Sequence, residues 1–198
     1  MKKPDAQLYE AKLKKLKILL KLEDSGAIDL LFGDETGFSL EPYIPYGWLK
    51  IGKQTPIPSQ REKVGNVFGV MSRYGQANMF WTHQNINSFY ILKCLDQLAD
   101  EIQKTTVVVL DQATWHTAKI IRQQFDKWAN KGLYIFFLPP YSPHLNLIEI
   151  LWRKIKYEWL EPQDYFSAQH LKKAVLDIFQ NLNSDFSINF SKNSLFNL

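Results

Sequence analysis

The sequence predicts an α/β fold: a mixed five-stranded sheet flanked by helices, with an N-terminal amphipathic helix in front of it. Two continuous apolar runs, at 106–110 and 134–138, are typical of strands that are covered on both faces. Three predicted strands open the body, and a strand–helix–strand–helix order follows. This order indicates a sheet whose strands do not all run in one direction.

The first predicted element is a helix over residues 5–22, which the stretch "EDSGA" ends at Gly26. Its apolar residues recur at helical spacing and are Tyr9, Leu13, Leu16 and Leu20. Lysines occupy most of the remaining circumference. The repeat is too short for a coiled coil, so we expect this helix to dock on the body or on a partner.

The later elements follow in order along the chain. We expect strands at 28–35, 105–111 and 133–140, and two more within 66–81 around a turn at 72–75. A turn at Gly37 and a proline-containing loop are expected after the first strand. Helices are predicted over 88–102, 118–132, 146–160 and 167–182. The predicted organisation is a basic arm (1–27), a body (28–183) and a polar tail (184–198).

Composition narrows the class of protein. The 198 residues contain one cysteine, Cys94, which excludes a disulfide framework and a cysteine-based zinc site. Apolar runs are too short for a membrane helix, so we expect a soluble, cytoplasmic protein without a membrane partner. The net charge is +4, and residues 1–22 hold seven lysines against Asp5 and Glu10. This basic arm favours a polyanionic partner.

Three acids share one context, because each follows a predicted buried strand. Asp34 follows "LLFG", Asp111 follows "VVVL", and Glu149 lies in the first turn of the helix after the third apolar strand. Groups beyond the carboxyl ends of strands in an open α/β sheet converge on the ligand crevice. Carboxylates held that close repel each other unless a cation lies between them. Three acids are enough for a pair of Mg²⁺ ions that clamp a phosphodiester.

Each acid also has an ordinary structural interpretation, which local sequence leaves open. Asp34 would suit the first position of a "DETG" turn, and Asp111 would suit the cap of the next helix. Glu149 would complete a capping box with Asn146, or pair with Arg153 one turn later. The constellation of three acids, rather than any one of them, favours a site.

Four stretches together resemble the catalytic domain of bacterial insertion-sequence transposases of the mariner-like superfamily, the DDE endonucleases. They are "FGDETGF", "VVVLDQATWH", "YGWLKIGKQ" and, most specifically, "LPPYSPHLNLIEILWRKIK", and they span residues 28–160. The resemblance implies an RNase H-like fold in which Asp34, Asp111 and Glu149 are the catalytic, metal-binding acids. It also implies two Mg²⁺ ions, which Mn²⁺ can replace, cleavage of DNA at transposon ends, and transfer of the 3′-hydroxyl into target DNA.

The sequence departs from that family in two ways. Leu147 stands where the family usually has proline, and Gln112 stands where it commonly has asparagine; neither change removes a metal ligand. Full-length relatives carry helix-turn-helix units, which about 27 residues cannot contain. We therefore expect a catalytic half: either a truncated relic, or a second frame whose partner is an upstream helix-turn-helix protein or fused frame. A homodimer is also expected.

Candidate DNA contacts follow the basic clusters, and they would place the protein on the nucleoid. They are Lys50, Lys53 and Arg61 after the first acid, Arg153 and Lys156 beside Glu149, and Trp115 and His116 beside Asp111. Packing is the more common role for an aromatic residue such as Trp115. Two rival functions stay open: an RNase H-like nuclease without strand transfer, and a decayed fragment that acts only as a DNA-binding or dimerisation module.

Overall fold

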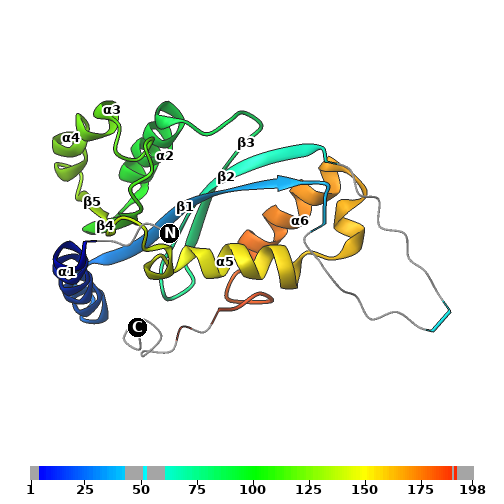
Figure 1. The fold of residues 1–198 in the computed structure, drawn as a ribbon, viewed down its shortest axis with the longest axis horizontal. Helices are drawn as coiled ribbons and strands as arrows, with labels where there is room; N and C mark the ends of the chain where they lie inside the picture. The colour runs from blue at the N-terminus through cyan, green and yellow to red at the C-terminus, as the bar shows by residue number, and fades with distance from the viewer. Residues whose placement is uncertain (1–4, 43–50, 53–60, 189, 191–198) are drawn as a thin grey trace.

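A mixed five-stranded sheet forms the centre of the protein (Figure 1). The computed structural model describes residues 5–42, 51–52, 61–188 and 190. The strands lie in the order β3-β2-β1-β4-β5, and their bounds are β1 Asp29–Ser39, β2 Lys63–Met71, β3 Ala77–Thr82, β4 Thr106–Leu110 and β5 Leu133–Phe137. The first three strands are antiparallel, whereas β4 and β5 run parallel to β1. The predicted mixed α/β sheet is confirmed.

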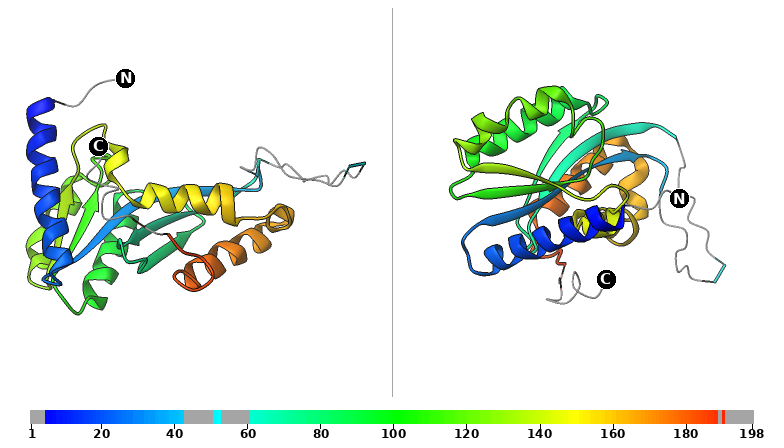
Figure 2. Two further views of the ribbon diagram at one scale, coloured as in Figure 1. Left: turned by 90° about the horizontal axis from the view of Figure 1, so that it is seen from below. Right: turned by 60° about the vertical axis from the view of Figure 1, so that its left-hand side comes forward.

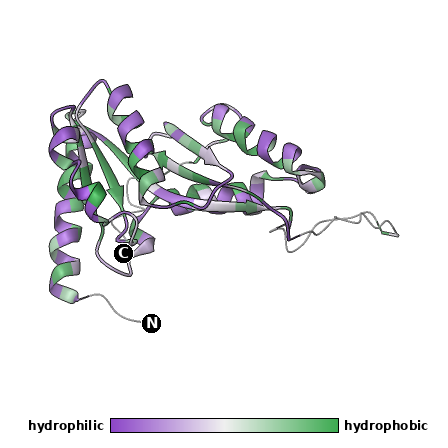
Figure 3. Ribbon diagram, turned by 90° about the horizontal axis from the view of Figure 1, so that it is seen from above, coloured by the Kyte–Doolittle hydropathy of each residue, from purple (hydrophilic) through white to green (hydrophobic). Residues whose placement is uncertain are grey.

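Helices cover both faces of this sheet. Their bounds are α1 Ala6–Asp24, α2 Ser88–Glu101, α3 Lys119–Arg122, α4 Phe125–Ala129, α5 Ile148–Lys154 and α6 Ala168–Gln180. Figure 2 shows α2, α3 and α4 on one side of the sheet, with α1 and α5 on the other. In Figure 3 the central strands are largely apolar, while the helices carry polar residues on their outer sides. No described helix is long and apolar enough to cross a membrane.

Alternation along the strands divides the core into two apolar clusters. In β4, Val107 and Val109 belong to the cluster under α1, α5 and α6, whereas Val108 and Leu110 belong to the cluster under α2 to α4. Successive side chains of a strand point to opposite faces, so both faces of β4 are buried. This explains why its sequence is continuously apolar.

β1 is longer than the sequence predicted. The expected turn at Gly37 is wrong, because β1 continues to Ser39 and stays paired with β2, with Thr36 opposite Val67. Phe38 is 1% exposed and packs in the core, so its burial favours continuation of the strand over a turn. As a result β1 extends well past the last residue of β4.

Three predicted helices differ in their details. The N-terminal helix runs over Ala6–Asp24, and Asp5 caps its first turn. The helix expected at 118–132 is divided into α3 and α4. The helix expected at 146–160 begins at Ile148 and changes into a π-helical turn at Ile155–Trp159.

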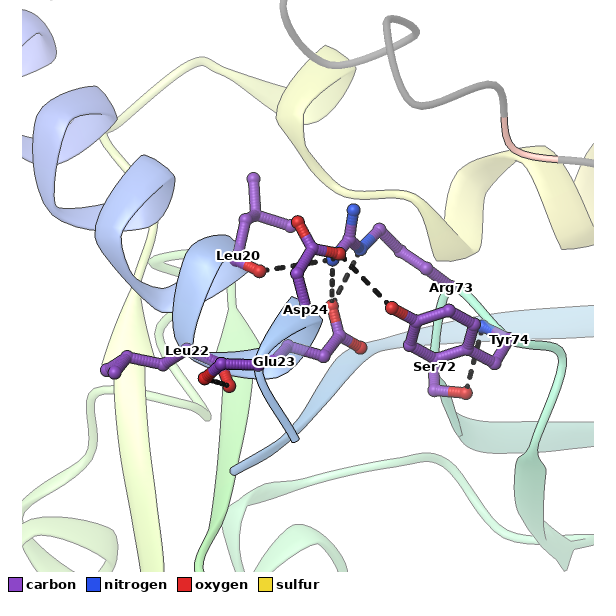
Figure 4. Close-up of polar contacts among 8 residues, drawn as sticks. Leu20, Leu22, Glu23, Asp24, Ser72, Arg73 and Tyr74 are labelled. Carbon is purple, nitrogen blue, oxygen red and sulfur yellow. Dashed lines mark hydrogen bonds and ion pairs between the residues drawn. The ribbon is translucent and has the colours of Figure 1, made fainter. Parts of the chain in front are cut away.

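An ionic cluster fastens the end of α1 to the β2–β3 turn (Figure 4). Arg73 Nε donates to Glu23 Oε2 at 2.6 Å, and Arg73 Nη2 lies 2.8 Å from Asp24 Oδ1. The Tyr74 hydroxyl also donates to Asp24 at 3.1 Å. Since Leu16 of α1 is 1% exposed, this helix is part of the same core as the sheet.

Candidate active site

The register of the two central parallel strands places Asp34 and Asp111 side by side. Parallel pairing runs from Asp29 opposite Thr106 to Phe32 opposite Val109. Two residues further along, the same register brings Asp34 next to Asp111. From the sequence we expected Asp34 to follow the buried part of its strand. It instead lies inside β1, opposite Gly69 of β2. β4 ends at Leu110, one residue before Asp111, so both carboxylates lie where β4 stops.

Glu149 is fixed from the other side by the start of α5. Asn146 donates its side-chain Nδ2 to the backbone carbonyl of Gly33 at 2.9 Å, one residue before Asp34. The alternative in which Asn146 and Glu149 form a capping box is wrong, since Leu147 is the N-cap residue and makes no side-chain capping bond. Asn146 instead ties the start of α5 to β1.

The three acids line one pocket of about 430 Å³. Asn146, Gln112 and the loop from Pro139 to Pro143 complete its walls. A neighbouring pocket of about 550 Å³ shares Asp34 and Glu149 and adds Arg153 and Lys156 of the α5 segment. The structure therefore brings together the three acids that the sequence singled out, with two of the predicted cations next to them.

Burial and like charge act together on Asp34. Burial raises the pKa of Asp34 to about 8, and the charges of Glu35, Glu149 and Asp111 act in the same direction. The pKa of Glu149 is also raised, first by burial and then by Asp111, while Lys156 opposes the change. Such a concentration of carboxylates is stabilised by a positive charge.

The donor set of the pocket fits hard divalent cations. Its ligating atoms are carboxylate oxygens, which Mg²⁺ and Mn²⁺ prefer. The side-chain Oδ1 of Asn146 is buried and has no hydrogen-bond partner, so it is a further oxygen on the same wall. Within the described residues, no three His, Cys, Asp or Glu side chains are arranged to hold one ion.

His116 has a position that the sequence did not predict. Its ring is completely buried, with Nδ1 2.7 Å from Asp111 Oδ1 and Nε2 2.6 Å from Glu35 Oε1. The expectation that His116 contacts DNA is corrected, because the side chain has no exposed surface. Burial lowers the pKa of His116, but the bonds to Asp111 and Glu35 outweigh this effect and raise it to about 9.

Asp111 receives two hydrogen bonds on one oxygen. Its Oδ1 accepts from His116 and from the backbone N–H of Ala113 at 2.9 Å. Burial alone would raise the pKa of Asp111, but these two bonds hold it below the ordinary value. The alternative that Asp111 caps the next helix is wrong, since Ala118 is the N-cap residue of α3.

The remaining candidate DNA contacts are placed differently. Arg153 is exposed, Lys156 is partly buried, and Arg61 is exposed at 3.8 Å from Glu41. Trp115 is 39% exposed and packs edge-on against His116. Lys50 and Lys53 lie outside the described residues.

The fold is an RNase H-like mixed α/β sheet, and three carboxylates meet in one pocket beside it. Residues 29–172 match the family model described as DDE superfamily endonuclease, which covers well over half of the sequence. The chain belongs to this family.

Solved structures of Mos1 transposase have the same fold. The Mos1 catalytic domain is 14% identical with a TM-score of 0.59, covering 100% of this chain and 91% of that one. The Mos1 paired-end complex with Mn is 16% identical with a TM-score of 0.62, covering 100% and 61%. The Mos1 strand transfer complex is 17% identical with a TM-score of 0.57, covering 90% and 56%.

One curated relative matches a short part of the sequence. "Uncharacterized protein y4pE/y4sA" of Sinorhizobium fredii is 35% identical over 54 residues, which are 27% of this chain and 36% of that protein. The chain thus spans about a third of this relative, and 56% and 61% of the Mos1 chains in the two DNA complexes.

Proposed function

We propose that this chain is the catalytic domain of a DNA transposase, which cleaves DNA at transposon ends and joins the freed 3′-hydroxyl to target DNA. The observation that carries the proposal is the meeting of Asp34, Asp111 and Glu149 in one pocket of a chain from the DDE endonuclease family. The Mos1 paired-end and strand transfer complexes, which have this fold, support transposon ends and target DNA as the substrates.

The three acids are proposed to hold two divalent ions, Mg²⁺ or Mn²⁺. Mos1 paired-end complexes with Mn and with Mg support this assignment, as does the pocket of oxygen donors. Bound divalent ions activate the attacking oxygen and stabilise the negative charge that develops on the phosphate. The protein's own part is positioning: β1 and β4 fix the two aspartates in register, and the Asn146–Gly33 bond sets the start of α5.

Phosphate contacts are assigned to the cations around the pocket. Arg153 and Lys156 line the pocket next to Glu149, and Arg61 is exposed two residues before β2. Lys50 and Lys53 are also proposed to contact phosphates, and Trp115 to stack on a base. Contacts of this kind make binding salt-sensitive and largely independent of DNA sequence.

A homodimer and an upstream helix-turn-helix partner protein belong to the same proposal.

The test is a nicking and joining assay. We expect the protein to nick supercoiled plasmid in the presence of Mn²⁺ and to join a pre-cut 3′ end to target DNA. Asp34→Asn, Asp111→Asn and Glu149→Gln should each abolish both steps. Asp177→Asn, at an exposed acid on α6, is the matched control and should leave both unchanged.

The outcomes separate the rival functions. Nicking without joining would identify a nuclease rather than a transposase. DNA binding without metal-dependent nicking would identify a binding module. Nicking by Asp111→Asn at the wild-type rate would contradict the assignment of the acids.

A further inference from the structure

His116 connects the acid pocket to a second acid on the opposite face of the sheet. Asp34 and Glu35 are neighbours in β1, so their side chains point to opposite faces. Asp34 lines the acid pocket, whereas Glu35 Oε1 contacts His116 Nε2 at 2.6 Å. The middle of this connection is the most buried part: the His116 side chain is 0% exposed, whereas those of Glu35 and Asp111 are 12% and 49% exposed.

The contacts leave Asp111 little freedom. Both of its hydrogen bonds, from His116 Nδ1 at 2.7 Å and from the Ala113 N–H at 2.9 Å, fall on Oδ1. Two directed bonds to one oxygen fix the rotation of the carboxylate, and Oδ2 is then the oxygen available to the pocket. The imidazole cannot turn away from Asp111, because its other nitrogen is held by Glu35 and Phe68 packs against the ring.

We propose that His116 and Glu35 are positioning residues, which clamp Asp111 so that it presents a single oxygen, Oδ2, to a divalent ion in the pocket. This inference rests on the proposed function, and it gives the two acids of the "DE" pair different roles: Asp34 serves the pocket and Glu35 serves the clamp. Groups that orient a metal ligand in this way commonly change metal affinity by about 10–100-fold when they are removed.

Mn²⁺ binding tests the clamp directly, through titration followed by electron paramagnetic resonance. His116→Ala should weaken Mn²⁺ binding by about 10–100-fold. His116→Asn keeps a donor close to the position of Nδ1, so it should recover a large part of the affinity. Glu35→Gln should cause a smaller loss, because the bond between His116 and Asp111 survives.

Val108→Ala is the matched control. This substitution opens a cavity in the apolar cluster between the sheet and α2 to α4, which also contains Phe68. It removes no hydrogen-bond partner of any acid. If Val108→Ala weakens Mn²⁺ binding as much as His116→Ala does, the loss reflects general loosening of the fold and the clamp is refuted. Equal affinity of His116→Ala and wild type would refute it as well.

A second measurement needs no metal. In the metal-free protein, nitrogen-detected NMR of the imidazole should show both N–H protons protected from exchange. Asp111→Asn should shift the Nδ1 signal and Glu35→Gln the Nε2 signal. Rapid exchange of both protons would overturn the clamp. Protected protons in a wild-type protein that binds no Mn²⁺ would instead overturn the metal site in the proposed function, so the two failures are distinguishable.

Discussion

Asn146 and Gly33 join the two elements that carry Glu149 and Asp34. The asparagine Nδ2 donates to the glycine carbonyl at 2.9 Å, and Asn146 itself is only 3% exposed. The bond therefore connects the start of α5 to β1 at a buried point, one residue before Asp34 and three residues before Glu149. Its loss should move one acid relative to the other.

Asn146→Ala is expected to lower both stability and activity. Removing the amide leaves the buried Gly33 carbonyl without its donor, which costs about 1–3 kcal/mol. Chemical denaturation measures this loss, and the plasmid nicking rate should fall by at least about tenfold, because small misplacements of reacting groups are costly. Asn87→Ala is the matched control: it removes the cap of α2, costs about 1 kcal/mol and spares nicking. Equal nicking by the two variants would contradict a positioning role for Asn146.

Asp34 and Asp111 should have opposite effects on stability in metal-free buffer. The pKa of Asp34 in the folded protein is about 8, well above its ordinary value, chiefly because the group is buried. Stability is therefore lost as the pH rises from about 4 to about 8. Asp34→Asn removes this penalty, so its melting temperature should exceed that of wild type at pH 8 by several degrees, and the difference should vanish near pH 4.

For Asp111 the dependence of stability on pH has the opposite sign. Hydrogen bonds from His116 and Ala113 hold its pKa below the ordinary value. It therefore contributes stability above the unfolded-state pKa of about 4, and this contribution disappears as the pH falls through the lower folded-state value. Asp111→Asn should melt below wild type at pH 7. Thermal scans with a chelator present provide the measurement, and a fall in melting temperature for Asp34→Asn at pH 8 would contradict this account.

The order of the predicted strands and helices, together with the apolar runs, was sufficient to predict most of the fold. β4 is recognisable because both of its faces are buried, which makes its sequence continuously apolar. The end of β1 was not predictable, because Gly37 and the neighbouring polar residues favour a turn locally. The deciding factor is the packing of Phe38 in the distant core, which local sequence does not contain.

The three acids that line the pocket were singled out from the sequence because each follows an apolar run, whereas the residues that contact them were not predicted. The roles of Glu35 and His116 depend on which face of the sheet each side chain occupies, and on a contact across 81 positions in the sequence. Strand alternation did contain one signal: the side chains of adjacent acids in a strand point to opposite faces of the sheet. The role of Asn146 stayed open at the level of sequence, because its spacing to Glu149 also fits a capping box.

Gly69 lies opposite Asp34 in β2, where no side chain fits. A Cβ at this position would stand 2.6 Å from the Trp152 ring of α5. Gly69→Ala should therefore push α5 away from the sheet, costing about 1–3 kcal/mol in denaturation and reducing nicking through Glu149. Gly37→Ala is the comparison, since its Cβ would meet the Asn66 side-chain oxygen at 3.2 Å and the Gly65 carbonyl oxygen at 4.0 Å. If Gly69→Ala is no less stable than Gly37→Ala, the close packing of α5 on β2 is not a constraint.

The ion pair between Arg73 and Glu23 should matter for stability because Glu23 is only 5% exposed. Burial raises the pKa of Glu23, while Arg73 opposes that change. Arg73→Met leaves a buried carboxylate without its partner, and we expect a loss of about 3–5 kcal/mol in the free energy of unfolding.

The double variant Arg73→Met/Glu23→Leu removes both charges and should recover most of that loss, because two apolar side chains then replace the pair. Chemical denaturation of the single and double variants, with Lys104→Met at the exposed pair with Asp29 as control, measures the difference. The control should lose less than about 1 kcal/mol. A double variant as unstable as Arg73→Met alone would show that the ion pair is not what fastens α1 to the β2–β3 turn.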